Sequence, residues 1–301
     1  MAIGKYLKEI GRGKDGARAL SRVDAADLFG QVLDRSVTDL EIGAFCLAMR
    51  IKGETAEEMA GFLDATRERT ALIPAPSQPV VVIPSYNGAR KLPLLTPLLA
   101  LLLAREGLPV LIHGAATEDR RVFVSEVLAA LGITAQEATQ SIAPGSVGFV
   151  PTEALCPGLL SLLEVRRVVN LRNPGHSLVK LMNPVDGPTL IISSYTHPEY
   201  AVSMAETFSL VQANALLVRG TEGEAVADPR RTPRMQAFVG GVATDLQAYQ
   251  TGSLESLPTL PTTTEAGPTA RYIEAVLAGA QALPTPIAQQ VAHIVQLHQQ
   301  L

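Results

Sequence analysis

The chain has 301 residues, 47% hydrophobic and 18% charged, which excludes a disordered protein and leaves room for two domains. Its net charge of −4 and its aromatic content of 4%, without tryptophan, speak against a protein that is basic throughout or that stacks nucleic-acid bases. The longest apolar run, 94–104, is too short to cross a membrane, and residues 1–22 lack the layout of a signal peptide, so we expect a cytoplasmic protein without membrane contact.

The first quarter of the chain is predicted to be helical. Ser21, Thr38 and Thr55 are each followed three residues later by an acidic residue, which is the pattern of a capping box at a helix N-terminus. We therefore expect residues 2–70 to form a four-helix unit, within a small all-helical domain that spans 1–72.

Beyond a proline-rich crossing at 71–79 the pattern changes, because short apolar runs now alternate with helical stretches. We expect strands at 80–83, 109–112, 189–193 and 215–219. The expected helices are 95–106, 119–131, 198–210, 269–282 and 285–300. Strands separated by helices imply a mostly parallel sheet, so the fold class is α/β. The larger α/β domain is assigned to 73–156 and 186–301, and the stretch 157–185 is expected to return to the helical domain.

The loop after the first long strand is the first candidate site. In an open α/β sheet such a loop commonly binds phosphate on free backbone N–H groups. The stretch PSYNGARK has a single glycine, Gly88, with Tyr86 before it and Arg90 and Lys91 after it. It is therefore a ligand loop, a ligand loop that has lost its function, or a plain connection, and a ligand loop would bind phosphate through its side chains.

A second loop is expected beside it. The strand that ends at His113 and Gly114 should be the neighbour of the first strand, so the helix start that follows would bring Arg120 and Arg121 to the same edge. Thr117 or Asp119 is predicted to cap that helix. The alternative is a loop whose positive charge arises by chance.

Two further basic clusters occur later in the chain. After Glu164, the stretch 165–184 contains no acidic residue but carries Arg166, Arg167, Arg172 and Lys180. The loop 227–235, after the strand 215–219, carries Arg230, Arg231 and Arg234. Cations without local partners favour an anionic ligand, either a phosphate or a carboxylate across a domain interface. Solvated surface charge is the alternative.

Signals for metal or nucleophile chemistry are weak. The five histidines have no ligand spacing with cysteines or carboxylates, and no G-x-S-x-G motif is present, so no catalytic residue and no metal ligand is assigned. The acidic pairs Glu57–Glu58 and Glu222–Glu224 have contexts typical of the protein surface, and we expect them to be solvated.

The chain resembles the anthranilate phosphoribosyltransferases, of glycosyltransferase family 3, and their nucleoside-phosphorylase relatives. The likeness begins in the helical segment 20–61, above all in the R-x-K-G-E-T-x-E-E run at 50–58, and continues through LPVLIHG at 108–114 and LLVRGTEG at 216–223. It implies a small helical domain, a larger α/β domain, an active site in the cleft between them, and a homodimer formed through the helical domain.

The catalytic motifs of that family do not match. Its diphosphate loop G-T-G-G-D falls on 83–87 with no identity, its N-x-S-T motif keeps only Thr96, and its magnesium-binding Asp-Glu pair falls on Ala225 and Val226, with Glu224 nearby. Arg166 matches the arginine that the family uses on anthranilate. The remnant of a substrate cleft would consist of Ser85, Tyr86, Asn87, Gly88, Thr96, His113 and Gly114.

These departures resemble a divergent, YbiB-type branch of the family that is implicated in nucleic-acid binding. The resemblance implies a protein that contacts DNA or RNA phosphates with little sequence specificity and without a cofactor. The alternative is a phosphoribosyltransferase or phosphorylase-like enzyme for another anionic substrate, which would require magnesium. A further alternative is that the cations serve a protein partner or solubility.

Overall fold

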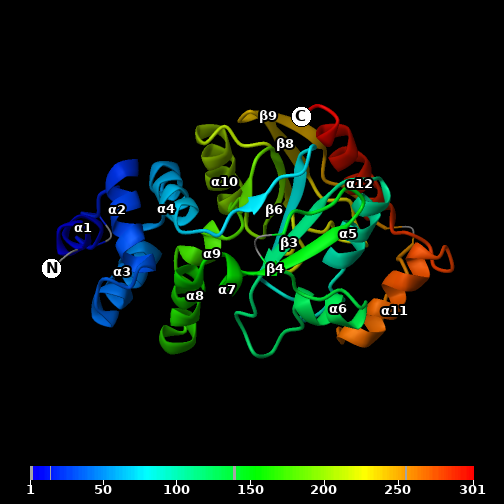
Figure 1. The fold of residues 1–301 in the computed structure, drawn as a ribbon, viewed down its shortest axis with the longest axis horizontal. Helices are drawn as coiled ribbons and strands as arrows, with labels where there is room; N and C mark the ends of the chain where they lie inside the picture. Colours follow the sequence, from blue (N-terminus) through cyan, green and yellow to red (C-terminus); the bar gives the residue numbers. More distant parts are fainter. Residues whose placement is uncertain (1–2, 14, 138–139, 255) are drawn as a thin grey trace.

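The computed structural model describes residues 3–13, 15–137, 140–254 and 256–301. Its first part is a helical unit that lies at one end of the molecule (Figure 1). The helices of this unit are α1 (Gly4–Ile10), α2 (Arg22–Leu33), α3 (Asp39–Lys52) and α4 (Ala56–Glu68). The sequence prediction of four helices in 2–70 is confirmed.

Local capping explains where these helices begin. The side chains of Ser21, Thr38 and Thr55 each accept a hydrogen bond from the backbone N–H three residues later, and Thr38 and Thr55 form complete capping boxes with Glu41 and Glu58. The helices then pack on a small aromatic core, which consists of Phe29, Phe45 and Phe62.

The second part is built on a seven-stranded sheet. Its strands, in spatial order, are β4 (Val147–Pro151), β3 (Val110–Gly114), β2 (Val80–Ser85), β6 (Thr189–Tyr195), β7 (Ala215–Arg219), β8 (Met235–Val239) and β9 (Val242–Gln247). The first five strands are mutually parallel, and only β8 and β9 run antiparallel to their neighbours. A mostly parallel α/β sheet was expected, and it is confirmed.

Helices cover both faces of this sheet, as a buried parallel sheet requires. One face packs against α5 (Thr96–Arg105), α6 (Val124–Ala130), α11 (Ala266–Leu277) and α12 (Thr285–His298). The other face packs against α10 (Pro198–Leu210), whose Met204 and Phe208 belong to the same apolar core as the helical unit. The two parts of the chain therefore share one core.

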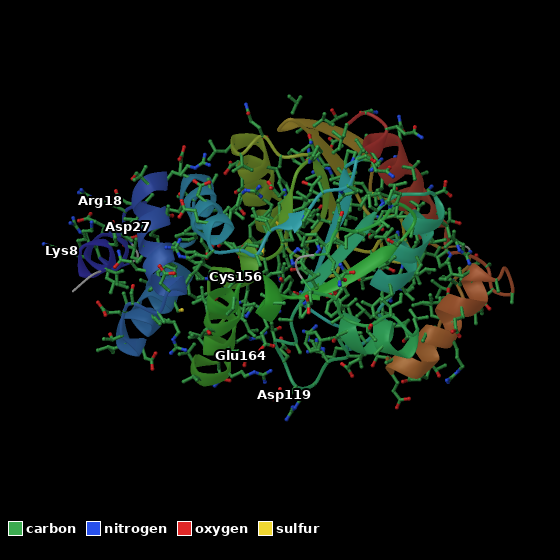
Figure 2. The ribbon with its side chains drawn as sticks, viewed as in Figure 1. Lys8, Arg18, Asp27, Asp119, Cys156 and Glu164 are labelled. Atoms are coloured by element: carbon green, nitrogen blue, oxygen red, sulfur yellow. The ribbon has the colours of Figure 1, made fainter. Side chains whose placement is uncertain are left out.

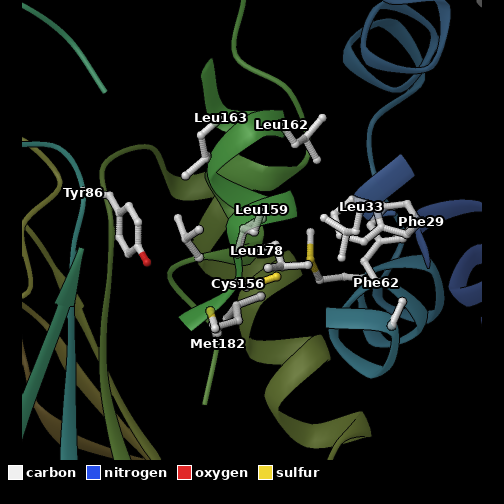
Figure 3. Packing of buried hydrophobic residues seen from close by; sticks show 14 of the residues in the cluster. Phe29, Leu33, Phe62, Tyr86, Cys156, Leu159, Leu162, Leu163, Leu178 and Met182 are labelled. Atoms are coloured by element: carbon white, nitrogen blue, oxygen red, sulfur yellow. The ribbon is translucent and has the colours of Figure 1, made fainter. Parts of the chain in front are cut away.

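Three helices and a two-stranded sheet connect the parts. The helices are α7 (Thr152–Leu155), α8 (Pro157–Val169) and α9 (Gly175–Leu178), and the strands β1 (Ile73–Pro74) and β5 (Val185–Asp186) pair in parallel. Figure 3 shows Leu159 and Leu178 between Phe62 of the helical unit and Tyr86 at the edge of the sheet. Helix α8 packs on α2, and α9 packs on α4.

The structure corrects two details of the sequence prediction. The helix expected at 119–131 begins at Val124, where Glu126 accepts a hydrogen bond from the N–H of Phe123. Thr117 does not cap it, because its hydroxyl donates to the carbonyl of Tyr86, and Asp119 pairs with Arg167 instead. The strands β4, β8 and β9 of the sheet were also not predicted. Among the described residues, no helix is long and apolar enough to span a membrane.

Candidate anion-binding site

The candidate site lies where the carboxyl ends of β2, β3, β6 and β7 meet. Ser85 at the end of β2 pairs with Gly114 at the end of β3, and a β-carbon on Gly114 would lie only 2.1 Å from the Ser85 carbonyl oxygen. Glycine is therefore required there for the two strand ends to approach. Three loops gather above these ends, namely 86–95 after β2, 115–123 after β3 and 220–234 after β7.

A buried carboxylate occupies the loop after β2. Oε1 of Glu224 accepts hydrogen bonds from the backbone N–H groups of Asn87 at 2.9 Å and Gly88 at 2.8 Å. Oε2 accepts from the hydroxyl groups of Ser85 and of Thr96, the latter at 3.1 Å. Glu224 is 2% exposed, so the expectation of a solvated carboxylate is wrong. The surrounding sequence is polar, but the hydrogen-bond donors of this carboxylate lie more than 120 positions away in the chain.

A second carboxylate fills the continuation of the same loop. Oε2 of Glu222 accepts three consecutive backbone N–H groups, those of Arg90 at 3.1 Å, Lys91 at 3.0 Å and Leu92 at 3.2 Å. Burial raises the pKa of Glu222, but these three donors together with Arg121 hold it below its ordinary value. Glu222 is therefore ionised at neutral pH. Of the other acidic pair, Glu58 is fully buried in its capping box, so the surface expectation fails there too.

The segment that carries these two carboxylates is fixed by its own backbone. The carbonyl of Glu222 accepts from Asn87 Nδ2 at 2.8 Å, and the carbonyl of Gly223 accepts from Ser194 Oγ at 2.8 Å and Lys180 Nζ at 3.1 Å. A β-carbon on Gly223 would lie 1.9 Å from Asn87 Nδ2, so only glycine fits between the two loops.

Lys180 is half-buried beside this segment. Its Nζ donates to the carbonyls of Gly223 and Ser194, and burial lowers its pKa to about 8, although the nearby Glu224 opposes that shift. The amine thus contacts the chain's own backbone on the side of Glu224. Its amine is therefore engaged by the chain itself, and not exposed as the sequence prediction of a phosphate ligand required.

Tyr86 and His113 lie inside the protein. The Tyr86 hydroxyl is 2.8 Å from His113 Nδ1 and 2.7 Å from Thr152 Oγ1, and His113 is fully buried. Burial lowers the pKa of His113 to about 3, so the ring is neutral. Both side chains are buried and contact each other, so neither is exposed to a ligand as the sequence prediction required.

Around Glu118 the structure brings together residues that the sequence left in separate clusters. Arg121, Arg166 and Arg172 all form ion pairs with this one carboxylate, the last at 3.8 Å. Burial raises the pKa of Glu118, but Arg166 and Arg121 bring it below the ordinary value. Three guanidinium groups on one carboxylate leave a local excess of positive charge.

Exposed cations extend this group of charges along the surface. Arg167 pairs with both Asp119 and Glu164, which Figure 2 shows on neighbouring parts of the surface. Within the part of the chain that the structure describes, Arg90, Lys91 and Arg120 are exposed and form no ion pair. We call the following set the basic rim: Arg90, Lys91, Arg120, Arg121, Arg166, Arg167 and Arg172.

The basic rim carries a net positive charge in an acidic protein. Its seven cations face four carboxylates, which are Glu118, Asp119, Glu164 and Glu222. The rim is continuous because residues 89 and 122 form an antiparallel bridge and Arg121 donates to the carbonyl of Gly88 at 3.3 Å. It therefore joins the loops after β2 and β3 to the end of α8.

The third basic cluster is engaged by the chain itself. Arg230 pairs with Asp228, Arg234 pairs with Asp245, and Arg231 donates to the carbonyls of Gln250 and Gly252. These arginines follow β7 as expected, but their donors are largely used in contacts within the segment 227–252, which contains β8 and β9.

A cavity of about 340 Å³ lies between the helical unit and α10, beside the site just described. Arg50, Arg172 and Lys180 line it together with His176, Tyr195 and Tyr200. His176 Nε2 is buried without a partner in the described chain, and burial lowers the pKa of this histidine to about 3. The walls thus combine cations, a neutral imidazole and two phenol rings.

Sequence reasoning missed the two carboxylates that organise the site. Glu222 and Glu224 stand in the chain next to Gly223 and close to the expected magnesium motif, which was the available signal. Glu118 was missed because only Arg121 is close to it in the chain, while its other partners, Arg166 and Arg172, come from a distant stretch.

Comparison with known proteins gives the family. The helical bundle domain of a glycosyl transferase family matches residues 5–70. The uncharacterized protein YbiB of Escherichia coli K12 is 40% identical over 296 residues, which cover 96% of this chain and 92% of YbiB. The chain belongs to the YbiB branch of the anthranilate phosphoribosyltransferase family.

More distant relatives are anthranilate phosphoribosyltransferases, and solved structures of such enzymes share the fold of this chain. The anthranilate phosphoribosyltransferase of Persephonella marina is 25% identical over 73% of this chain and 66% of its own. The solved structure of anthranilate phosphoribosyltransferase from Thermus thermophilus has a TM-score of 0.71 and 23% identity, and the match covers 95% of this chain and 85% of that enzyme. The enzyme from Saccharomyces cerevisiae, in complex with PRPP and Mg, has a TM-score of 0.72 at 17% identity, and the match covers 98% of this chain and 88% of that enzyme.

Proposed function

We propose that this protein binds the phosphate backbone of nucleic acid, with little sequence specificity, through the basic rim. One observation carries the proposal: Arg90, Lys91 and Arg120 are exposed and form no ion pair among the described residues. They belong to the same basic rim as the three arginines that pair with Glu118. Arginine and lysine on a continuous surface neutralise phosphates along a strand without reading bases. The scarcity of aromatic residues fits contacts of this kind.

The loop that carries Arg90 and Lys91 is held in place by hydrogen bonds, which also supports the proposal. Its backbone N–H groups are bound to Glu222 and Glu224, so the cations project from a loop that the chain itself holds rigid. A rigid loop loses little conformational entropy when its side chains bind a strand. Arg121, Arg166 and Arg172 would then contribute to the field around the strand, while Glu118 fixes their positions.

We further propose that the protein acts as a homodimer formed through α3. Leu40, Leu47 and Ile51 lie on one stripe of this helix and are 82%, 50% and 59% exposed. A helix face of this kind is stabilised when a second apolar surface covers it. Two copies joined in this way would present two basic rims to one nucleic-acid molecule, which raises the overall affinity.

A fluorescence-anisotropy titration tests the proposal. Single-stranded DNA, double-stranded DNA and single-stranded RNA of equal length are titrated with the full chain at increasing KCl concentration. We expect binding at low salt to all three, and an affinity that falls by roughly one power of salt for each neutralised phosphate. Absence of binding at low salt, or an affinity that does not change with salt, would overturn the proposal.

A transferase or phosphorylase for another anionic substrate is the second candidate, and the cavity between α4 and α10 favours it. Arg50 and Arg172 are placed to hold a carboxylate or phosphate there, beside Tyr195 and Tyr200. If this candidate is right, phosphoribosyl diphosphate with magnesium, or the acceptor substrate, raises the melting temperature of the protein. An unchanged melting temperature with phosphoribosyl diphosphate, anthranilate and nucleosides, together with salt-dependent DNA binding, would decide for the first proposal.

A further inference from the structure

We propose that Tyr249, with Arg219 and Arg231 beside it, is a contact for an unpaired base, which adds affinity for single-stranded nucleic acid and none for a duplex. The inference rests on the proposed function, because it concerns a strand whose phosphates are held at the basic rim. It goes beyond that function, since phosphate contacts alone do not favour a single strand over a duplex, which carries the higher charge density.

These three residues lie at the edge of the sheet that also carries the basic rim. Arg219 is the last residue of β7, which runs parallel to β2. Strand β8 is antiparallel to β7 and β9 is antiparallel to β8, so β9 ends at this same edge, just before Tyr249. Strands β2 and β7 are separated only by β6, which places their ends about 10 Å apart. A strand of a few nucleotides therefore reaches from the loop after β2 to Arg219.

The ring of Tyr249 is open to solvent and has two cations beside it. Its exposed fraction is 44%, and the Cζ atoms of Arg219 and Arg231 lie 6.0 and 5.8 Å from the centre of the ring. Guanidinium groups at this distance are attracted to the ring. Every base has a π-face that stacks on an aromatic ring or on a guanidinium plane. The cluster therefore offers a stacking surface that accepts any base.

Hydrogen bonds hold the segment after β9 against the loop after β7. The backbone N–H of Gln250 donates to the carbonyl of Thr232 at 3.0 Å, and the side-chain carbonyl of Gln250 accepts from the N–H of Thr232 at 3.1 Å. Arg231 donates to the carbonyls of Gln250 and Gly252 at 3.0 and 2.9 Å. Tyr249 is therefore held in position by its neighbours before a strand binds, which lowers the entropy cost of the contact.

Arg219 supplies a cation for the phosphate next to the stacked base. Its side chain is exposed and forms no ion pair within the described part of the chain. Its backbone N–H donates to the carbonyl of Arg234 at 3.4 Å, which ties the end of β7 to the neighbouring strand. The low aromatic content of the chain argues against a platform for many bases, but a single ring is enough for one base.

The experiment measures the affinity of Tyr249→Ala and of the wild type by fluorescence anisotropy, for single-stranded DNA and for a duplex of equal length at one low salt concentration. Two controls accompany it. Tyr249→Phe keeps the ring, and Leu257→Ala shortens a side chain that is 64% exposed in the same connection after β9. We expect Tyr249→Ala to weaken binding of the single strand about fivefold or more and to leave binding of the duplex unchanged. Both controls should bind like the wild type.

The outcomes separate this inference from the proposed function. An unchanged affinity of Tyr249→Ala for the single strand, or an equal loss for single strand and duplex, contradicts base stacking while salt-dependent binding stands. A loss of the same size in Leu257→Ala or in Tyr249→Phe contradicts a specific role of the ring. Absence of binding by the wild type contradicts the proposed function, and this inference with it.

Discussion

At the scale of single residues, Glu224 shows how an acidic side chain can be stable inside a protein. Burial of a carboxylate is costly, but four hydrogen bonds from Ser85, Asn87, Gly88 and Thr96 replace the lost water. Two of the donors are backbone N–H groups whose positions are set by the fold. The residue is therefore part of the architecture and not only of a ligand site.

Replacement of Glu224 by glutamine should destabilise the protein. Glutamine keeps the shape but loses the charge, and its NH₂ group meets donors where a carboxylate oxygen accepted, so we expect a loss of about 1–3 kcal/mol in the free energy of unfolding. Urea denaturation followed by circular dichroism measures this. The exposed Glu206→Gln serves as the control, and a loss no larger than that of the control would mean that the four hydrogen bonds contribute little.

His113 should make the stability depend on pH. Its pKa is about 3 in the folded protein and 6.5 in the unfolded chain, so only the unfolded state takes up a proton between these values. The free energy of unfolding therefore falls as the pH is lowered through this window, by at most about 1.4 kcal/mol per pH unit from this group.

The variant His113→Gln isolates that contribution, because it cannot take up the proton. We expect a smaller decrease in the free energy of unfolding than in the wild type between about pH 6 and pH 5, a range above the window of the carboxylates. His176 contributes in the same direction in both proteins and cancels in the comparison. Parallel pH profiles would show that His113 does not titrate as its burial requires.

At the scale of elements, the sequence predicts well the helix boundaries that are set by contacts between nearby residues. Thr38 and Thr55 begin their helices through contacts three residues away, and this pattern is visible in the chain. The start of α6 was misplaced because Thr117 contacts Tyr86, which is 31 positions away. The hairpin of β8 and β9 was missed although Gly240 and Gly241 form its two-residue turn, which is a known sequence signal.

The exposed stripe of α3 carries the prediction of dimer formation. Replacement of Leu47 and Ile51 by glutamate places two like charges on each copy at the proposed interface, and we expect the protein to become monomeric. Size-exclusion chromatography with light scattering measures the mass, and circular dichroism verifies the fold. Val202→Glu on α10 is an equally exposed control at 60%. A wild type that is already monomeric would contradict the proposed interface.

At the scale of the whole molecule, the fold brings together charges that the chain keeps far apart. Arg121, Arg166 and Arg172 were recognised in the sequence as basic. The pairing of Arg121 with Glu118 is local, but the arrival of Arg166 and Arg172 at the same carboxylate follows only from the position of α8. The sequence therefore predicts which residues are cationic. It does not predict that Lys180 and Arg231 are used internally while Arg90 and Arg120 are exposed.

The central claim, that the basic rim binds phosphate backbone, is tested most directly by the salt dependence of DNA binding in matched charge-reversal variants. Arg90→Glu with Arg120→Glu changes the rim, and Arg105→Glu with Arg271→Glu makes the same change in net charge on α5 and α11. We predict that the slope of log affinity against log salt becomes smaller by about one for each lost phosphate contact in the rim variant and is unchanged in the control. Equal slopes and equal affinities in the two variants would contradict the claim.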